Sequence, residues 1–190
     1  MGVPDPARSR AVLIGVDGYD HLDDLPAVGN NVRRLAELLT DHDLWGLPAE
    51  RCVVLHNPST TDAVLNAVHE AAGAAEDAFV LYFAGHGLVS PVGEVDLHLA
   101  LPDWDDNRSY RSVAYSALRH ALVDTCTAYA RVALLDCCYS GIVLKGYMSP
   151  PNMADLAAVD GTYVMTASSE TQLARAPEGG RNSPPLRASW

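Results

Sequence analysis

Two side chains of this sequence could form a nucleophile–base pair. His86 stands between Gly85 and Gly87 just after an apolar run, and Cys138 stands just after another, 52 residues later (138 − 86). A thiol is mostly protonated at neutral pH, and a nearby imidazole can take its proton and later supply one to a leaving amine. We therefore predict nucleophilic catalysis, with Cys138 as the nucleophile and His86 as its general base.

Residues around this pair extend the hypothesis. The backbone N–H groups of Gly87 and Cys138 are expected to stabilise the oxyanion of a tetrahedral intermediate. Because side chains alternate along a strand, Cys137 is expected to point away from Cys138 and into packing. Cys52 and Cys126 lack the spacing of a zinc site and are interpreted as small buried hydrophobic residues.

Five short apolar runs are the elements that must position the pair. They are continuous and rich in branched side chains, as is typical of strands buried on both faces of a parallel sheet. They cover residues 11–16, 52–55, 78–83, 131–135 and 162–165. The carboxyl ends of parallel strands meet at one edge, where functional groups collect. His86 and Cys138 are therefore expected at this edge, just past the ends of their strands.

Segments with helical periodicity separate the apolar runs. Three helices are expected, the first of them around residues 28–39. The second would begin after a cap at Ser59 or Thr60, and the third would cover about 115–125. The alternation of strands and helices predicts an α/β domain with a mainly parallel sheet flanked by helices. The first helix is expected to bury one face, formed by Val28, Val32, Leu35, Leu38 and Leu39.

Composition and charge exclude several classes of protein. The 190 residues are 48% hydrophobic and 19% charged, which is a globular balance. A net charge of −11 argues against a nucleic-acid-binding surface and is compatible with basic partners or substrates. No apolar run approaches the roughly 20 residues that span a bilayer. We expect no nucleic-acid or membrane partner and a cytoplasmic location.

At these residues the chain resembles the caspase–metacaspase superfamily. The marks of that family are a strand ending in a small-Gly-His-Gly turn and a later strand ending in Asp-x-Cys-x-Ser-Gly. The two motifs appear here as Ala84-Gly85-His86-Gly87 and Asp136-Cys137-Cys138-Tyr139-Ser140-Gly141, with the family's spacing of about 50 residues. The chain is more similar to metacaspases and short bacterial relatives than to animal caspases, which carry Gln-Ala-Cys at the nucleophile. Ala84 departs from the Ser that metacaspases often have.

The resemblance implies a three-layer fold and a division of the chain. Its sheet would have six strands, but the residues after 176 show no clear pattern, so the last strand is expected to be missing or degenerate. We assign residues 1–9 to a disordered N-terminal segment, 10–176 to a caspase-like peptidase domain and 177–190 to an irregular C-terminal tail. Regulatory domains or partner proteins are expected, and a role in regulated cell death or antiviral defence follows by analogy.

The resemblance also implies substrate-binding and processing residues. The residue two before the nucleophile helps to line the family's pocket for the side chain that precedes the scissile bond. Here this residue is Asp136, and Asp17 or Asp20 would add negative charge. We therefore predict protein or peptide substrates that are cleaved after Arg or Lys. Lys145 lies in the loop where many relatives are cut on activation, so it is the predicted processing site.

No metal or other cofactor is expected. Some metacaspases need calcium, and an acidic loop is present here, formed by Asp96, Asp103, Asp105 and Asp106. We interpret this loop as a solvated one. Some calcium-dependent relatives have an acid seven residues after the nucleophile, and Lys145 occupies that position.

Two other hypotheses stay open beside an active cysteine endopeptidase. One is a catalytically silent caspase-like module that acts by binding or signalling, and the other is a different α/β enzyme or a nucleotide-binding protein. The presence of both His86 and Cys138 favours the active enzyme over the silent module. Residues 15–20 do not form a phosphate-loop pattern, which counts against nucleotide binding.

Overall fold

The structure is a computed structural model that describes residues 3–89, 96–105, 107–108, 110–139 and 161–166. Within β6 it describes Cys138 and Tyr139 by their backbone alone. The strands are β1 (Arg10–Gly15), β2 (Cys52–His56), β3 (Ala78–Val89), β4 (Leu97–Ala100), β5 (Ser112–Ala114), β6 (Ala130–Tyr139) and β7 (Tyr163–Thr166). The helices are α1 (Val28–Thr40), α2 (Thr61–Ala74) and α3 (Tyr115–His120), which continues into a π-helical turn, η3 (Ala121–Thr125).

The sheet has a parallel part and an antiparallel extension. The parallel strands run in the order β2-β1-β3-β6-β7. β4 pairs antiparallel with the last residues of β3, and β5 pairs antiparallel with β4. Gly87 pairs with β6 on one side and with β4 on the other, so β4 lies on the same side of β3 as β1. Along this side of β3, the pairing with β1 ends at Ala84 and the pairing with β4 begins at Gly87, which leaves a short gap.

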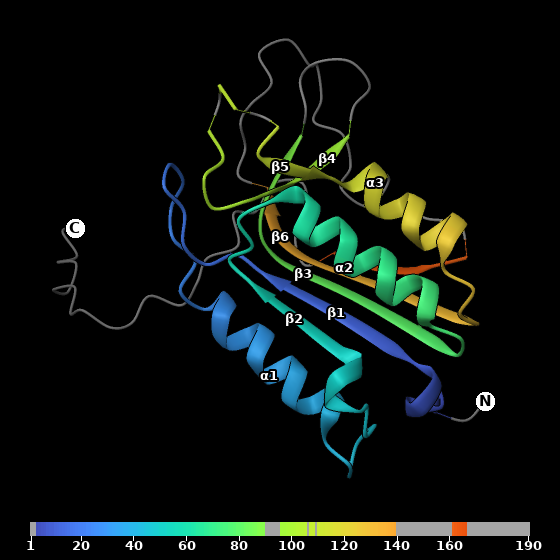
Figure 1. Cartoon of the computed structure of the whole chain (residues 1–190). Coiled ribbons are helices and arrows are strands. Elements are labelled where there is room, and N and C mark those ends of the chain that lie inside the picture. Colours follow the sequence, from blue (N-terminus) through green and yellow to red (C-terminus); the bar gives the residue numbers. More distant parts are fainter. Residues whose placement is uncertain (1–2, 90–95, 106, 109, 140–160, 167–190) are drawn as a thin grey trace, which may run out of the picture.

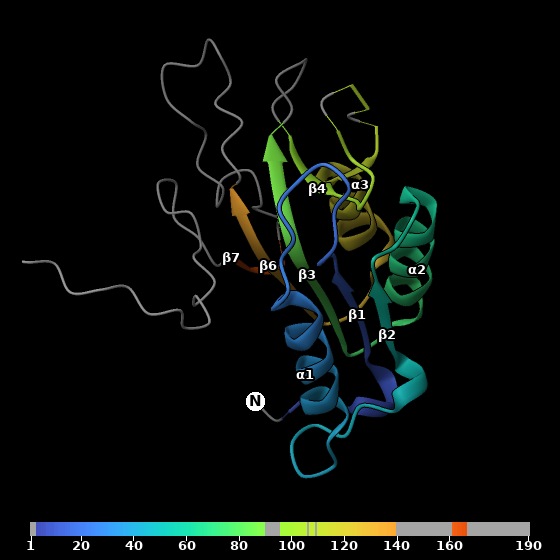
Figure 2. The same ribbon diagram turned by 90° about the vertical axis from the view of Figure 1, so that its left-hand side faces the viewer.

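Helices cover both faces of the sheet, as expected for three layers (Figure 1). Turned by 90°, the molecule shows α1 on one face and α2 with α3 on the other (Figure 2). The larger core lies on the α2 face and includes Phe79, Leu81 and Leu135, whereas the smaller core on the α1 face includes Leu13 and Tyr82. The predicted α/β fold with a mainly parallel sheet flanked by helices is confirmed.

The helices follow from the pattern of their residues. Thr60 caps α2, since its Oγ1 accepts the N–H of Ala63 at 3.2 Å. In α1, Val28 and Val32 are buried, whereas Leu38 is 37% exposed although we expected it on the buried face. The apolar stripe of α1 is therefore narrower than the sequence indicates.

Two strands extend further than the sequence predicts. The segment of β3 that holds Gly85, His86 and Gly87 is extended backbone in the middle of the sheet, and β6 continues through Cys138. The expectation that His86 and Cys138 lie just past the ends of their strands is thus wrong. Each strand is longer because the other one pairs with it over ten residues, and β4 adds pairing at the end of β3.

The start of the chain also departs from its predicted disorder. Pro6–Arg8 form a 3₁₀ turn, and Ser9 is fully buried. The Oγ of Ser9 accepts the N–H of Ala78 at 3.1 Å, which joins this segment to β3. Residues 3–9 therefore pack on the domain, and the predicted C-terminal tail, 177–190, lies outside the described residues.

None of the helices described is long and apolar enough to cross a lipid bilayer.

Candidate active site

The register of β3 and β6 places the two predicted catalytic residues side by side. His86 pairs with Cys138, and Ala84 pairs with Asp136. Neighbouring strands lie about 4.8 Å apart. Sequence analysis predicted a common edge for the pair, and the register makes the two positions direct neighbours in the sheet.

The imidazole of His86 is held in one tautomer. The ring is buried, with 7% of the residue exposed, and its Nε2 lies 2.8 Å from the carbonyl oxygen of Asp23. A carbonyl only accepts, so Nε2 must carry the hydrogen and donate it. In the neutral ring, Nδ1 then has a free lone pair, and this atom is buried with no hydrogen-bond partner among the described residues. This is the state that a general base needs.

Tyr19 contacts both the backbone and the ring of His86. The hydroxyl of Tyr19 accepts the N–H of His86 at 2.9 Å. The two rings lie with centroids 4.7 Å apart and an interplanar angle of 57°. Gly85 allows this approach, because a Cβ there would lie 2.8 Å from the tyrosine oxygen. Sequence reasoning assigned Tyr19 no role in the site, because none of these contacts is local.

Asp136 lies two positions before Cys138 and accepts a hydrogen bond. Its Oδ2 is 3.1 Å from the hydroxyl of Tyr82, which donates. Burial, together with the charge and hydrogen bond of Asp136, raises the pKa of Tyr82 well above its ordinary value. The phenol therefore stays a donor at neutral pH and orients the carboxylate.

The other two predicted substrate-binding acids are placed differently. Asp17 turns toward β2, where His56 Nε2 lies 2.7 Å from Oδ2 and Asn57 Nδ2 donates to Oδ1 at 2.7 Å. Burial raises the pKa of Asp17, but the hydrogen bonds of His56 and Asn57 outweigh it, and the net pKa lies below the ordinary value. Asp20 is exposed, and its N–H donates to the carbonyl of Pro102. The partners of Asp17 and Asp20 thus differ from Tyr82, the partner of Asp136.

The residues beside the pair belong to the sheet and its core. Cys137 is 2% exposed and lies in the core on the α2 face, as its expected packing role requires. Gly87 pairs with Leu99 of β4 and Tyr139 of β6, so its backbone takes part in the sheet. The oxyanion-stabilising role of the Gly87 and Cys138 N–H groups stays a prediction.

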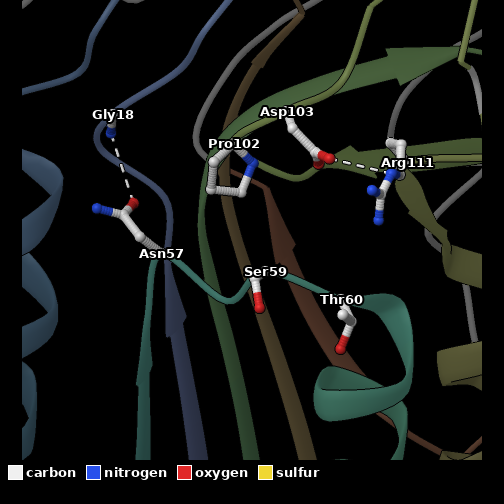
Figure 3. Close-up of a pocket in the computed structure, with 7 residues that line it drawn as sticks. All are labelled: Gly18, Asn57, Ser59, Thr60, Pro102, Asp103 and Arg111. Atoms are coloured by element: carbon white, nitrogen blue, oxygen red, sulfur yellow. Dashed lines mark hydrogen bonds and ion pairs between the residues drawn. The ribbon is translucent and has the colours of Figure 1, made fainter.

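A pocket of about 500 Å³ is lined by residues other than this pair (Figure 3). In this pocket, Asp103 Oδ2 lies 3.0 Å from Arg111 Nε and the hydroxyl of Thr60 caps α2, whereas Asp103 Oδ1 is buried with no hydrogen-bond partner among the described residues. We interpret it as a structural junction between loops. It is lined by Gly18, Asn57, Ser59, Thr60, Pro102, Asp103 and Arg111.

Three carboxylates of the acidic loop have hydrogen-bond or ion-pair partners within the protein. Asp103 pairs with Arg111, Asp105 pairs with Arg108 at 2.6 Å, and Asp96 accepts the hydroxyl of Ser116 at 2.6 Å. Within the described ranges, no group of three or more His, Cys, Asp or Glu side chains could hold a metal ion. Independence from calcium stays a prediction. Asp106 and Lys145 lie outside the described residues.

Fold and site together define an α/β domain with a histidine and a cysteine paired across adjacent parallel strands. Residues 8–186 match the family model of the caspase domain, a peptidase family, and the chain therefore belongs to this family of caspase-like cysteine peptidases. A comparison with curated proteins found no significant match.

Among solved structures, the fold is similar to that of protein GSU0716 from Geobacter sulfurreducens, with a TM-score of 0.56 and 22% sequence identity. The match covers 73% of this chain and 53% of that one, so this chain spans about half the length of its structural neighbour. At this identity the likeness concerns the fold alone.

Proposed function

We propose that the protein is a cysteine endopeptidase that uses His86 and Cys138 as a catalytic dyad. The observation that carries this proposal is the paired register of the two residues, combined with the imidazole tautomer set by Asp23. Nδ1 of His86 has the lone pair that a base requires, because the other ring nitrogen, Nε2, donates its hydrogen to the carbonyl of Asp23. Burial of an unpaired ring nitrogen costs stability, which is typical of a functional position.

The reaction then proceeds in two balanced steps. His86 takes the thiol proton, the sulfur of Cys138 bonds to the scissile carbonyl carbon, and His86 returns the proton to the amine as the C–N bond breaks. Water next attacks the thioester carbonyl, His86 takes a proton from that water, and the thiolate leaves as the C–S bond breaks. The carboxylic acid product is released, and the free enzyme is regenerated.

We further propose cleavage after Arg or Lys, with Asp136 as the specificity residue. Alternate positions of a strand share one face of a sheet, so positions 136 and 138 belong to the same face. A carboxylate oriented by Tyr82 can pair with a guanidinium or ammonium group. An aspartate side chain would meet like charge there, which disfavours the specificity of animal caspases.

A covalent peptide inhibitor ending in Arg tests the catalytic proposal directly. The reagent is expected to label Cys138 once per molecule, as located by mass spectrometry of the digested protein, and to abolish hydrolysis of a fluorogenic Arg peptide. Labelling of Cys137 instead, or no labelling with no hydrolysis, would contradict the proposal. The second result would favour a silent binding or signalling module.

Self-cleavage after Lys145 completes the proposed activity. It depends on the proposed specificity, because Lys145 carries a basic side chain of the type that Asp136 is proposed to bind. Intact masses of the wild type and of Cys138→Ala test it: the wild type is expected to split and the variant to stay whole. Identical intact masses with full activity would rule self-cleavage out. A cytoplasmic location and a role in regulated cell death or antiviral defence are part of the proposal by family analogy alone.

A further inference from the structure

The backbone around His86 lies in a gap on one side of its strand. β1 pairs with β3 only as far as Ala84, and β4 begins to pair at Gly87. The N–H of His86 falls between these two ladders, so no strand supplies its acceptor on this side. The hydroxyl of Tyr19 supplies it at 2.9 Å. A side chain here takes the place of a missing strand partner.

The ring of Tyr19 makes a second contact with the same residue. It lies against the imidazole at a centroid distance of 4.7 Å, which is within the range of favourable aromatic contacts. Gly85 leaves the space that this approach needs, because a Cβ at this position would lie 2.8 Å from both the tyrosine oxygen and Cζ of Phe83. One side chain thus restrains both the backbone and the ring of His86.

The loop that carries Tyr19 also carries the carbonyl that binds Nε2. Residues 16–27 are tied together by the N–H of Tyr19, which donates to Asp24 Oδ1 at 2.9 Å, and by the N–H of Leu25, which donates to the carbonyl of Asp17 at 2.8 Å. Tyr19 and Asp23 therefore hold the histidine from one loop. Asp23 determines which nitrogen carries the hydrogen, and Tyr19 determines where the ring lies.

We propose that Tyr19 is a positioning residue that keeps the imidazole of His86 at the distance and angle that proton transfer from Cys138 requires. This inference rests on the proposed Cys–His dyad. It assigns Tyr19 no contact with substrate. Its loss should therefore lower kcat and leave the KM for peptide substrates nearly unchanged, because misplacement of a base affects the chemical step.

The test compares Tyr19→Phe with wild type and with Tyr129→Phe as the control. Tyr19→Phe keeps the ring and removes the one oxygen that accepts the His86 N–H, and Tyr129 is 83% exposed and distant from the site in the fold. Tyr19→Phe is expected to lower kcat for an Arg peptide about tenfold, the order of effect of leaving a buried donor unpaired. KM should stay within about twofold of wild type, and the control should match wild type in both constants.

Alkylation of Cys138 by iodoacetamide supplies a readout that needs no substrate. Its rate at neutral pH should fall in Tyr19→Phe by about the same factor as kcat, because both depend on proton transfer to His86. Hydrogen exchange at the His86 amide should become faster in this variant, which verifies the loss of the bond independently of activity. A kcat within twofold of wild type, or a loss that appears in KM alone, would overturn the positioning role. A wild-type protein that neither hydrolyses peptides nor labels at Cys138 would instead overturn the proposed dyad.

Discussion

Two clusters of polar side chains lie at the carboxyl edge of this sheet, and they differ in what they leave unpaired. Between β1 and β2, both carboxylate oxygens of Asp17 have partners, His56 and Asn57. Between β3 and β6, Nδ1 of His86 has no partner in the described part of the chain, although it is buried. A saturated cluster stabilises the fold, whereas a buried nitrogen left with a free lone pair is ready to accept a proton.

The comparison also shows how one loop serves both clusters. Residues 16–27 begin at Asp17, which is joined to β2, and then supply Tyr19 and Asp23 to His86 on β3. The cluster around Asp17 therefore holds the start of the loop whose later residues contact His86. This division predicts that substitutions at the β3–β6 site change activity, whereas substitutions at the β1–β2 site mainly change stability.

The largest expected effect concerns Cys138, the proposed nucleophile. Cys138→Ala should reduce hydrolysis of an Arg peptide on the order of 10³-fold or more, because the covalent step is lost. Cys137→Ala is the matched control: it removes a buried sulfur from the core on the α2 face and should retain most of the activity, with a loss of about 1 kcal/mol in unfolding free energy. Steady-state kinetics and denaturant unfolding measure the two quantities. If Cys137→Ala were the inactive variant, the assignment of the nucleophile would be wrong.

A smaller effect is expected at Asp136, the proposed specificity residue. Asp136→Ala should lower kcat/KM for Arg and Lys peptides about tenfold to hundredfold, because a hydrogen-bonded ion pair with the substrate is lost. Asp43→Ala, at an exposed acid just after α1, serves as its control and should change little. Fluorogenic peptides ending in Arg, Lys and Asp measure the preference. An Arg preference that survives Asp136→Ala would keep the specificity and remove Asp136 as its cause.

The packing of α1 against β1 offers a test of stability. A Cβ at Gly15 would lie 2.6 Å from Cγ2 of Val32, so Gly15→Ala should push α1 away from β1 and cost about 1–3 kcal/mol of unfolding free energy. Gly18→Ala is the control, because its Cβ would approach nothing closer than Asn57 Nδ2 at 3.8 Å. Thermal or denaturant unfolding of the two variants checks this difference. Equal stabilities would show that α1 adapts to the added methyl group.

The smallest effect is the pH dependence of the saturated cluster. The pKa of Asp17 is lower in the folded protein than its ordinary value, so its ionised form stabilises the fold at pH values above that ordinary value. This contribution, about 1 kcal/mol for such hydrogen bonds, is lost as the pH falls through the lowered pKa. Asp17→Asn should therefore be less stable than wild type at neutral pH, and the gap should close in acid. A gap that is independent of pH would contradict the assigned ionisation.

Long regular elements and the motif residues could be predicted from the sequence. The five apolar runs correspond to β1, β2, β3, β6 and β7, and the cap at Thr60 was one of the two expected. β4 and β5 were missed because they have four and three residues, too few for a periodic signal, and pair with segments distant in the chain. The turn expected at His86 is extended strand because β6 and β4 supply partners that local sequence does not reveal.

The sequence by itself determined the fold class and the two residues proposed to carry the chemistry, because hydrophobic periodicity and motif spacing are local properties of the chain. The tertiary structure alone decided which residues control them. Three contacts of His86 join segments that lie far apart in the chain. They are its pairing with Cys138 in the sheet, the bond of its Nε2 to the carbonyl of Asp23, and the bond of its backbone N–H to the hydroxyl of Tyr19. The same holds for Asp17, whose partners His56 and Asn57 lie about 40 positions away in the chain. A carboxylate binds whichever donors the fold brings within reach, and only the packing of β1 against β2 determines which donors these are.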